Sequence, residues 1–170
     1  MISNYKKFLE SIGNGGYASY SGGDETHQFW GNVAGGVLPY CLKTKRFLMS
    51  YRSAYVNEPH TWGIWGGKLD DDEVQSEIKD VVRREFREET GFDCNCFELV
   101  PLYIYQSSDG NFKYYNFLGL FEDEFTPRLD WETEKFKWMT WDELMKLRPK
   151  HFGLKELLKK DKDKILRFIV

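Results

Sequence analysis

Three carboxylates lie close together in the sequence, at Glu85, Glu88 and Glu89. In a helix, the spacing i, i+3, i+4 places all three on one face, with Cβ atoms about 5–6 Å apart. Like charges at this distance repel, and Mg²⁺ or Mn²⁺ would remove the repulsion because hard divalent cations prefer oxygen ligands. Arg84 precedes Glu88 by four residues and can pair with it. The spacing alone therefore indicates either a metal site or a solvated acidic face.

A pair of glycines lies upstream of these carboxylates. Gly66 and Gly67 are followed by Lys68, which can steady a phosphate or remain a solvated lysine. Glycine allows the backbone to approach a ligand closely, and a backbone carbonyl oxygen can ligate a divalent ion. This context favours the metal site over the solvated face.

The carboxylates need a helix to hold them on one face. Apolar residues at positions 74, 78, 81, 82 and 86 form a stripe with helical spacing, which predicts a helix over residues 73–90. Asp72 is the expected N-cap, with Gln75 three residues later, and Gly91 is the expected C-terminal stop.

The residues around this helix resemble the signature of the Nudix hydrolase family. That signature reads G-x5-E-x7-R-E-U-x-E-E-x-G-U, where U is a bulky aliphatic or aromatic residue. Gly67 and Glu73 fit the first part, and Arg84-Glu85-Phe86-Arg87-Glu88-Glu89-Thr90-Gly91-Phe92 fits the second part at every fixed position. There is one departure, because ten residues rather than seven separate Glu73 from Arg84. The motif covers residues 67–92, and a looser resemblance extends over residues 33–148.

The resemblance implies a metal site that holds Mg²⁺ or Mn²⁺. Glu85 and Glu89 would be the main ligands, Glu88 a further ligand or the general base, and the Gly67 carbonyl oxygen would complete the coordination. Many members take another carboxylate from a later segment, for which the candidates are Glu132 and Glu134.

The resemblance also implies supporting and substrate-binding roles. The first Glu and the Arg of the motif pair in the family, so Glu73, or Glu77 in its place, would pair with Arg84. Arg52 and Lys68 are the candidates for contact with substrate phosphate.

Strand-like segments flank the helix on both sides. They lie at residues 33–42, 47–51, 62–67, 97–106, 112–122 and 134–139, with a hairpin turn at residues 43–46. Short helices are expected at residues 141–147 and 154–160, and an apolar segment closes the chain at residues 165–170. This order predicts an α/β (α+β) fold, and the resemblance implies a Nudix-like α/β/α sandwich with a central mixed β-sheet and a loop-helix-loop motif.

A chain of 170 residues has the length of one domain, which we expect to be a single Nudix domain over residues 1–170. Residues 1–28 would form an N-terminal helix, over residues 1–12, and a Gly-rich arm that includes a loop at residues 13–23. Residues 29–150 would form the core and residues 151–170 a C-terminal helical extension.

Composition excludes several classes of protein. With 24 Lys+Arg and 27 Asp+Glu, the net charge is −3, and general nucleic-acid binding is not expected. No apolar run approaches the roughly 18 residues of a membrane span, and the first residues are too polar for a signal peptide. Cys41, Cys94 and Cys96 are odd in number and include a close Cys-x-Cys pair, so we expect reduced cysteines and a cytoplasmic protein.

The resemblance to the Nudix hydrolases implies Mg²⁺- or Mn²⁺-dependent hydrolysis of a diphosphate bond in a nucleoside diphosphate linked to another group, by attack of a metal-activated water. The partner would be a small nucleotide substrate, and a homodimer is compatible with the family. A non-catalytic nucleotide-binding or sensor module with the same fold is the alternative, although such modules usually lack the motif carboxylates. An isoprenoid diphosphate isomerase is a third reading, for which Cys41 would be the needed cysteine. The identity of the nucleotide is left open.

Overall fold

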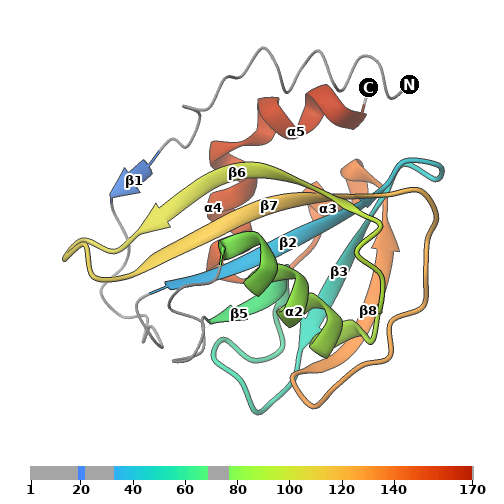
Figure 1. The fold of residues 1–170 in the computed structure, drawn as a ribbon, viewed down its shortest axis with the longest axis horizontal. Helices are drawn as coiled ribbons and strands as arrows, with labels where there is room; N and C mark the ends of the chain where they lie inside the picture. The colour runs from blue at the N-terminus through green and yellow to red at the C-terminus, as the bar shows by residue number, and fades with distance from the viewer. Residues whose placement is uncertain (1–18, 22–32, 69–76, 170) are drawn as a thin grey trace.

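The fold is a β-sheet with helices on both faces. The computed structural model describes residues 19–21, 33–68 and 77–169 (Figure 1). Its elements in chain order are β1 (Ser19–Ser21), β2 (Val33–Cys41), β3 (Arg46–Arg52), β4 (Trp62–Gly63), β5 (Trp65–Lys68), α2 (Ile78–Thr90), β6 (Glu98–Gln106), β7 (Lys113–Phe121), β8 (Thr133–Met139), α3 (Trp141–Lys146), α4 (Phe152–Lys160) and α5 (Lys162–Ile169). Among these described helices, none is long and apolar enough to cross a membrane.

The described strands form one mixed sheet of eight strands, in which six follow the order β1-β6-β7-β2-β3-β4, while β5 also pairs with β2 and β8 also pairs with β3. The pairs β1–β6 and β2–β7 are parallel, and the other pairs are antiparallel. The first part of β2 pairs with β5, whereas Tyr40 and Cys41 pair with β3, as the predicted hairpin requires. This change of partner places the glycine-containing strand β5 beside the first half of β2.

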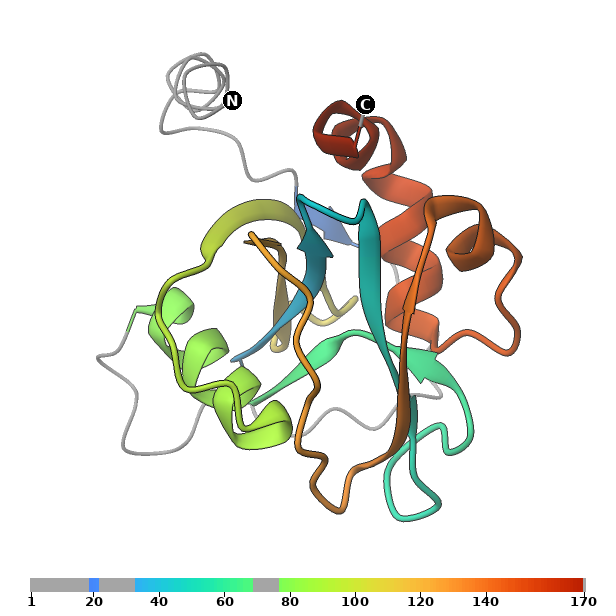
Figure 2. The same ribbon diagram turned by 90° about the vertical axis from the view of Figure 1, so that its right-hand side faces the viewer.

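The helices cover both faces of the sheet. Figure 2 shows α2 on one side of the strands and the C-terminal helices α4 and α5 on the other. One apolar core joins Trp65 to Phe86 of α2, and a second contains Leu144 of α3, Leu157 of α4 and Ile165 of α5. The predicted α/β/α sandwich with a mixed sheet is confirmed.

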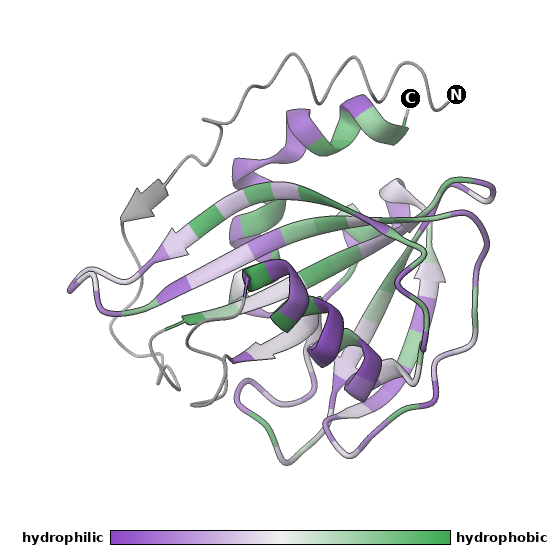
Figure 3. Cartoon of the chain, in the orientation of Figure 1, coloured by the Kyte–Doolittle hydropathy of each residue, from purple (hydrophilic) through white to green (hydrophobic). Residues whose placement is uncertain are grey.

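Phe86 anchors α2 to the sheet. Its side chain is fully buried, with ring centroids of Phe97 at 5.4 Å and Phe121 at 5.6 Å. Burial of one such side chain contributes about 1.5–3 kcal/mol. Figure 3 shows that much of the rest of α2 is hydrophilic, whereas hydrophobic residues are frequent in the central strands. The position of α2 therefore depends on one apolar stripe, as the periodicity predicts.

The ends of α2 agree only in part with the prediction. Gly91 ends the helix in the left-handed conformation, with φ 66°, and its N–H donates to the Arg87 carbonyl oxygen. The start is different, because α2 begins at Ile78 and Glu77 is its N-cap with extended dihedrals and no side-chain cap. The expected cap Asp72 lies outside the described residues.

One further segment differs from the prediction. Ser19–Ser21, expected within a loop, forms β1 because its backbone pairs in parallel with β6. The closing apolar segment belongs to the helix α5, Lys162–Ile169, which agrees with the helical extension expected there. The helix expected over residues 1–12 and most of the Gly-rich arm lie outside the described residues.

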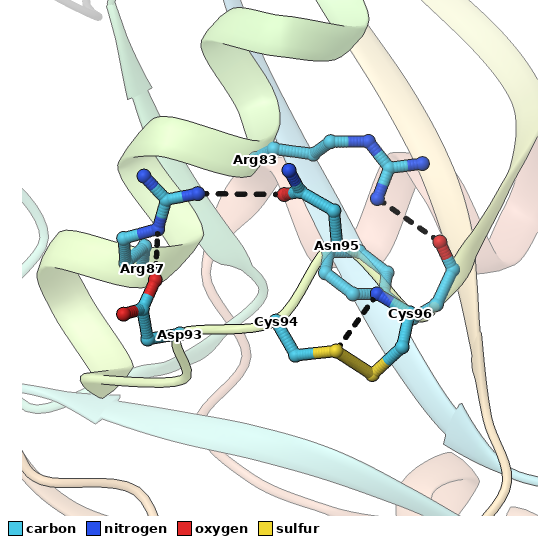
Figure 4. The surroundings of a disulfide bond; sticks show 7 residues. Arg83, Arg87, Asp93, Cys94, Asn95 and Cys96 are labelled. Atoms are coloured by element: carbon cyan, nitrogen blue, oxygen red, sulfur yellow. Dashed lines mark hydrogen bonds and ion pairs between the residues drawn. A yellow bond between two sulfur atoms is a disulfide. The ribbon is translucent and has the colours of Figure 1, made fainter.

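The loop after α2 contains a disulfide bond between Cys94 and Cys96 (Figure 4). The prediction that these cysteines are reduced is wrong, because the loop turns so that their Cα atoms lie 5.2 Å apart, within bridging reach. Arg87 holds this loop, since its Nε atom lies 3.1 Å from Asp93 Oδ1. Cys41 is free and buried. The cytoplasmic location stays a prediction.

Candidate active site

Glu89 is a carboxylate on the buried side of α2. Val82 and Phe86 lie seven and three residues before it, so the helical repeat turns all three toward the sheet. Glu89 is only 8% exposed. Its Oε2 atom accepts a 2.8 Å hydrogen bond from the backbone N–H of Gly66 in β5. One carboxylate therefore connects the helix to the glycine-containing strand.

The surroundings of Glu89 favour its neutral form. Burial raises the pKa of Glu89 well above its ordinary value, and the negative charges of Glu132, Asp130 and Glu85 raise it further. The hydrogen bond from Gly66 lowers this pKa, but its effect is smaller. An ionised Glu89 at neutral pH therefore needs a positive charge beside it. We call Glu85, Glu89, Asp130 and Glu132 the acidic cluster.

Glu85 lies one helical turn before Glu89, against Gly67. A Cβ atom on Gly67 would overlap the Glu85 carboxylate and lie 2.6 Å from its Cδ atom. Arg84 Nη2 lies 2.8 Å from Glu85 Oε1, and Arg84 Nη1 lies 3.0 Å from Glu88 Oε2. The absence of a side chain at Gly67 thus leaves room for Glu85, and one arginine holds two motif carboxylates.

The other predicted motif residues have the following positions. Glu88 is the most solvent-exposed of the three motif carboxylates, with 58% of its side chain exposed. Lys68 has an exposed side chain, and its carbonyl oxygen accepts from Arg84 Nη2 at 3.4 Å. Within the described part of the chain, the ion-pair partners of Arg84 do not include Glu77. Glu73, the other predicted partner, lies outside the described residues.

A loop between β7 and β8 brings two more carboxylates to α2. The Arg128 N–H donates to the Thr90 carbonyl oxygen, at the end of α2, at 2.7 Å. The Glu132 carbonyl oxygen accepts from the Ser53 N–H, just after β3, at 2.8 Å. Between these anchors, Asp130 Oδ1 accepts from the Glu132 N–H at 2.9 Å. The loop is therefore fixed to both the helix and the sheet.

The sequence suggests two later carboxylates as metal ligands. The negative charge of Glu132 raises the pKa of Glu89, whereas Glu134 lies beside His60. Burial and the charge of Asp130 raise the pKa of Glu132. Glu134 is half exposed, and its Oε2 atom lies 3.6 Å from Nδ1 of His60. The two differ because Glu132 lies in the turn before β8, whereas Glu134 lies within the strand.

Arg52 and Tyr114 lie close to the acidic cluster. The positive charge of Arg52 lowers the pKa of both Glu132 and Tyr114, and Arg52 Nε donates to the Asn57 carbonyl oxygen at 2.8 Å. Burial raises the pKa of Tyr114, and the charge of Glu89 raises it further. Tyr114 was not predicted from the sequence, because no motif marks it. Asp130 was not predicted either, and its only signal in the sequence is its place two residues before Glu132.

The residues of the acidic cluster fit a hard divalent cation by their chemistry. Within the described residues, no three His, Cys, Asp or Glu side chains already converge tightly enough to hold a metal ion. The donors are carboxylate oxygens, which is the ligand type that Mg²⁺ and Mn²⁺ prefer. Glu89 is buried beside three other negative charges, and a bound cation would offset that repulsion.

Three solved structures show the same fold. RenU, a Nudix hydrolase from M. smegmatis, matches with a TM-score of 0.70 and 17% identity over 82% of this chain and 89% of that chain. The NUDIX domain of Shewanella oneidensis NrtR, complexed with ADP ribose, matches with a TM-score of 0.60 and 15% identity over 92% of this chain and 97% of that chain. A C. elegans Ap4A hydrolase in a binary complex matches with a TM-score of 0.59 and 18% identity over 79% of this chain and 98% of that chain. At these identities the likeness establishes the fold alone.

Sequence comparison gives the family. No curated protein matches the chain. The model of the NUDIX domain, in contrast, matches residues 30–161. Because this match spans most of the chain, the protein belongs to the NUDIX domain family.

Proposed function

We propose that this protein hydrolyses a diphosphate bond in a nucleoside diphosphate linked to another group, with Mg²⁺ or Mn²⁺ bound at the acidic cluster. Family membership supports hydrolysis of nucleoside diphosphate derivatives. The observation that carries the metal dependence is the burial of Glu89 beside Glu85, Asp130 and Glu132. Four carboxylates in this arrangement repel one another, and a divalent cation would stabilise their ionised forms.

The positions of the side chains support a role for each. Glu85 and Glu89, with the Gly67 carbonyl oxygen, would hold the ion, and Glu132 would add an oxygen from the β7–β8 loop. When bound, the ion would neutralise phosphate charge and lower the pKa of the attacking water. Glu88 is the exposed motif carboxylate, and beside Arg84 it would accept a proton from that water or act as a further ligand.

Arg84 and Arg52 would position other groups. Arg84 orients Glu85 and Glu88 through its two Nη atoms, so it acts on the reaction through those carboxylates. Arg52 lies near Glu132 and is held by the Asn57 carbonyl oxygen, which supports contact with a substrate phosphate. Lys68, exposed at the end of β5, is a second phosphate contact in this proposal.

The test is hydrolysis of a panel of nucleotides with Mg²⁺ or Mn²⁺. The panel should include ADP ribose and diadenosine tetraphosphate, which the names of two structural relatives suggest, together with nucleoside triphosphates and nucleotide sugars. Glu89→Gln should lower turnover at least about 100-fold, because it removes the charge that holds the ion. Glu98→Gln, an exposed glutamate at the start of β6, is the matched control and should not change turnover.

The outcomes separate the proposal from its alternative. Loss of turnover in EDTA and in Glu89→Gln would support the hydrolase. Wild-type binding of a nucleotide by calorimetry, with no turnover of any member of the panel, would instead support a non-catalytic binding or sensor module. Turnover by Glu89→Gln within threefold of the wild type would contradict the assigned role of the acidic cluster.

A further inference from the structure

An open surface cavity lined by cations lies on the face of the sheet opposite α2. It has a volume of about 390 Å³ and lies where the loop after α3 meets α4 and α5. Small-molecule sites are commonly about 300–1,000 Å³. We call it the basic cavity, because five of its lining residues are basic: Arg148, Lys150, Lys155, Lys159 and Lys162.

The C-terminal helices supply three of these cations. Lys155, Lys159 and Lys162 follow one another at i, i+4 and i+7 and line the cavity together. Like charges at this spacing repel. Glu156, Asp161 and Asp163 lie beside them in the sequence, but within the described residues none of these carboxylates forms an ion pair with the three lysines. The Asp161 carboxylate instead accepts a hydrogen bond from the Tyr103 N–H.

Lys150 gives the cavity a buried charged group. It is only 7% exposed, and its Nζ donates to the carbonyl oxygens of Met145 at 2.9 Å and Leu147 at 2.8 Å. An ammonium group has three N–H donors, so one remains for a ligand in the cavity that Lys150 lines. Burial lowers the pKa of Lys150, and the charges of Arg148 and Lys155 lower it further.

Arg148 reaches the same two carbonyl oxygens. Its Nη1 atom donates to Met145 at 3.1 Å and to Leu147 at 2.6 Å. The end of α3 therefore brings two cations together without neutralising their charge. Within the described residues, none of the five basic residues of the cavity forms an ion pair with a carboxylate. The basic cavity therefore gathers five cations that, in the described part of the chain, lack a salt-bridged carboxylate, although the net charge of the whole chain is −3.

We propose that the basic cavity binds a small phosphate-bearing molecule, through several phosphate oxygens that contact its lysines and Arg148. Ammonium and guanidinium groups are strong hydrogen-bond donors to phosphate. A multiply charged phosphate group would relieve the repulsion among the five cations. This site is separate from the acidic cluster, because the sheet lies between the cavity and α2. The acidic cluster also repels anions when it holds no cation.

The test is calorimetric titration of inorganic pyrophosphate in EDTA, which keeps metal from the acidic cluster. The variant Lys155→Gln with Lys159→Gln should bind pyrophosphate at least about tenfold more weakly than the wild type. The matched control is Lys146→Gln with Lys164→Gln, which removes the same charge from α3 and α5 outside the cavity lining. The control should bind within twofold of the wild type. Lys155, Lys159 and Lys146 are exposed and Lys164 is partly exposed, so both variants should fold.

Two further titrations test the ligand and the location of the site. Citrate carries several negative charges without phosphate, and it should bind more weakly than pyrophosphate. Glu89→Gln should bind pyrophosphate as the wild type does, which separates this site from the proposed active site. Absence of pyrophosphate binding, equal weakening by the two double variants, or equal binding of citrate would each overturn the proposal.

Discussion

Replacement of Gly67 by alanine tests whether the Glu85 carboxylate must lie against β5. The added Cβ atom would overlap Glu85 Oε2 and lie 2.6 Å from Glu85 Cδ, whereas ordinary contact begins at 3.4 Å, so Glu85 must move by at least about 0.8 Å. A misplacement of about 1 Å can lower a rate about 100-fold, which is about 2.7 kcal/mol in activation free energy. We therefore expect Gly67→Ala to lower kcat/KM about 100-fold.

The same substitution should leave the fold almost unchanged. The group that must move is the end of a flexible side chain, so the backbone of β5 can keep its position. We expect Tm to fall by less than about 4 °C, which corresponds to about 1 kcal/mol for a chain of this size. Gly63→Ala is the matched control, because its Cβ atom would meet only ordinary contacts, the nearest being Arg52 Cδ at 3.6 Å.

The assay measures kcat/KM for the best substrate of the panel with Mg²⁺, and Tm for the same preparations. Gly63→Ala should match the wild type in both. If Gly67→Ala keeps kcat/KM within threefold of the wild type, the position of Glu85 against Gly67 does not matter for catalysis. If its Tm falls by more than 10 °C, the side chain does not absorb the overlap and the reasoning is also wrong.

Three other predictions concern individual side chains. Burial raises the pKa of Glu89 in the folded state. The protonated carboxyl therefore contributes fully to stability below the ordinary carboxyl pKa, and this contribution is lost as the pH rises through the raised pKa. In EDTA, Glu89→Gln should therefore be more stable than the wild type at pH 8 but not at pH 4, as measured by urea denaturation. Glu132→Gln should lower kcat at least about tenfold, whereas Glu134→Gln should not. The reason is that, of the two, only Glu132 lies close enough for its charge to raise the pKa of Glu89. Phe86→Ala should lower the free energy of unfolding by about 3–5 kcal/mol, measured by the same denaturation, and a loss below 1 kcal/mol would contradict the anchoring role of this ring.

Local spacing was enough to predict the helical half of the acidic cluster. The 3.6-residue repeat predicts the helix and places Glu85 and Glu89 on one face of it, whereas only the structure shows that Glu89 is turned toward the sheet together with Phe86. Gly91 ends the helix as predicted, because its left-handed conformation favours glycine. These features depend on residues that are neighbours in the chain.

The rest of the candidate site depends on contacts that sequence spacing does not contain. Asp130 comes near Glu89 because Arg128 binds the end of α2 and Ser53 binds the Glu132 backbone. Tyr114 comes near because β7 pairs in parallel with β2, a partner that a hairpin pattern does not suggest. The choice between Glu132 and Glu134 depended on where β8 begins, and predicted strand boundaries are uncertain by more than one residue.

Whole-chain charge was uninformative because two regions of opposite sign lie on opposite faces of the sheet. A net charge of −3 argues against general binding of polyanions, yet it sums an acidic cluster beside α2 and a basic cavity beside α4 and α5. The two regions should respond to metal in opposite ways. Phosphate should reach the acidic cluster only when a cation offsets its charge, whereas the basic cavity should bind phosphate without any metal. Comparison of pyrophosphate titrations in EDTA and in Mg²⁺ therefore separates them, and a single binding event seen only with Mg²⁺ would exclude the basic cavity as a phosphate site.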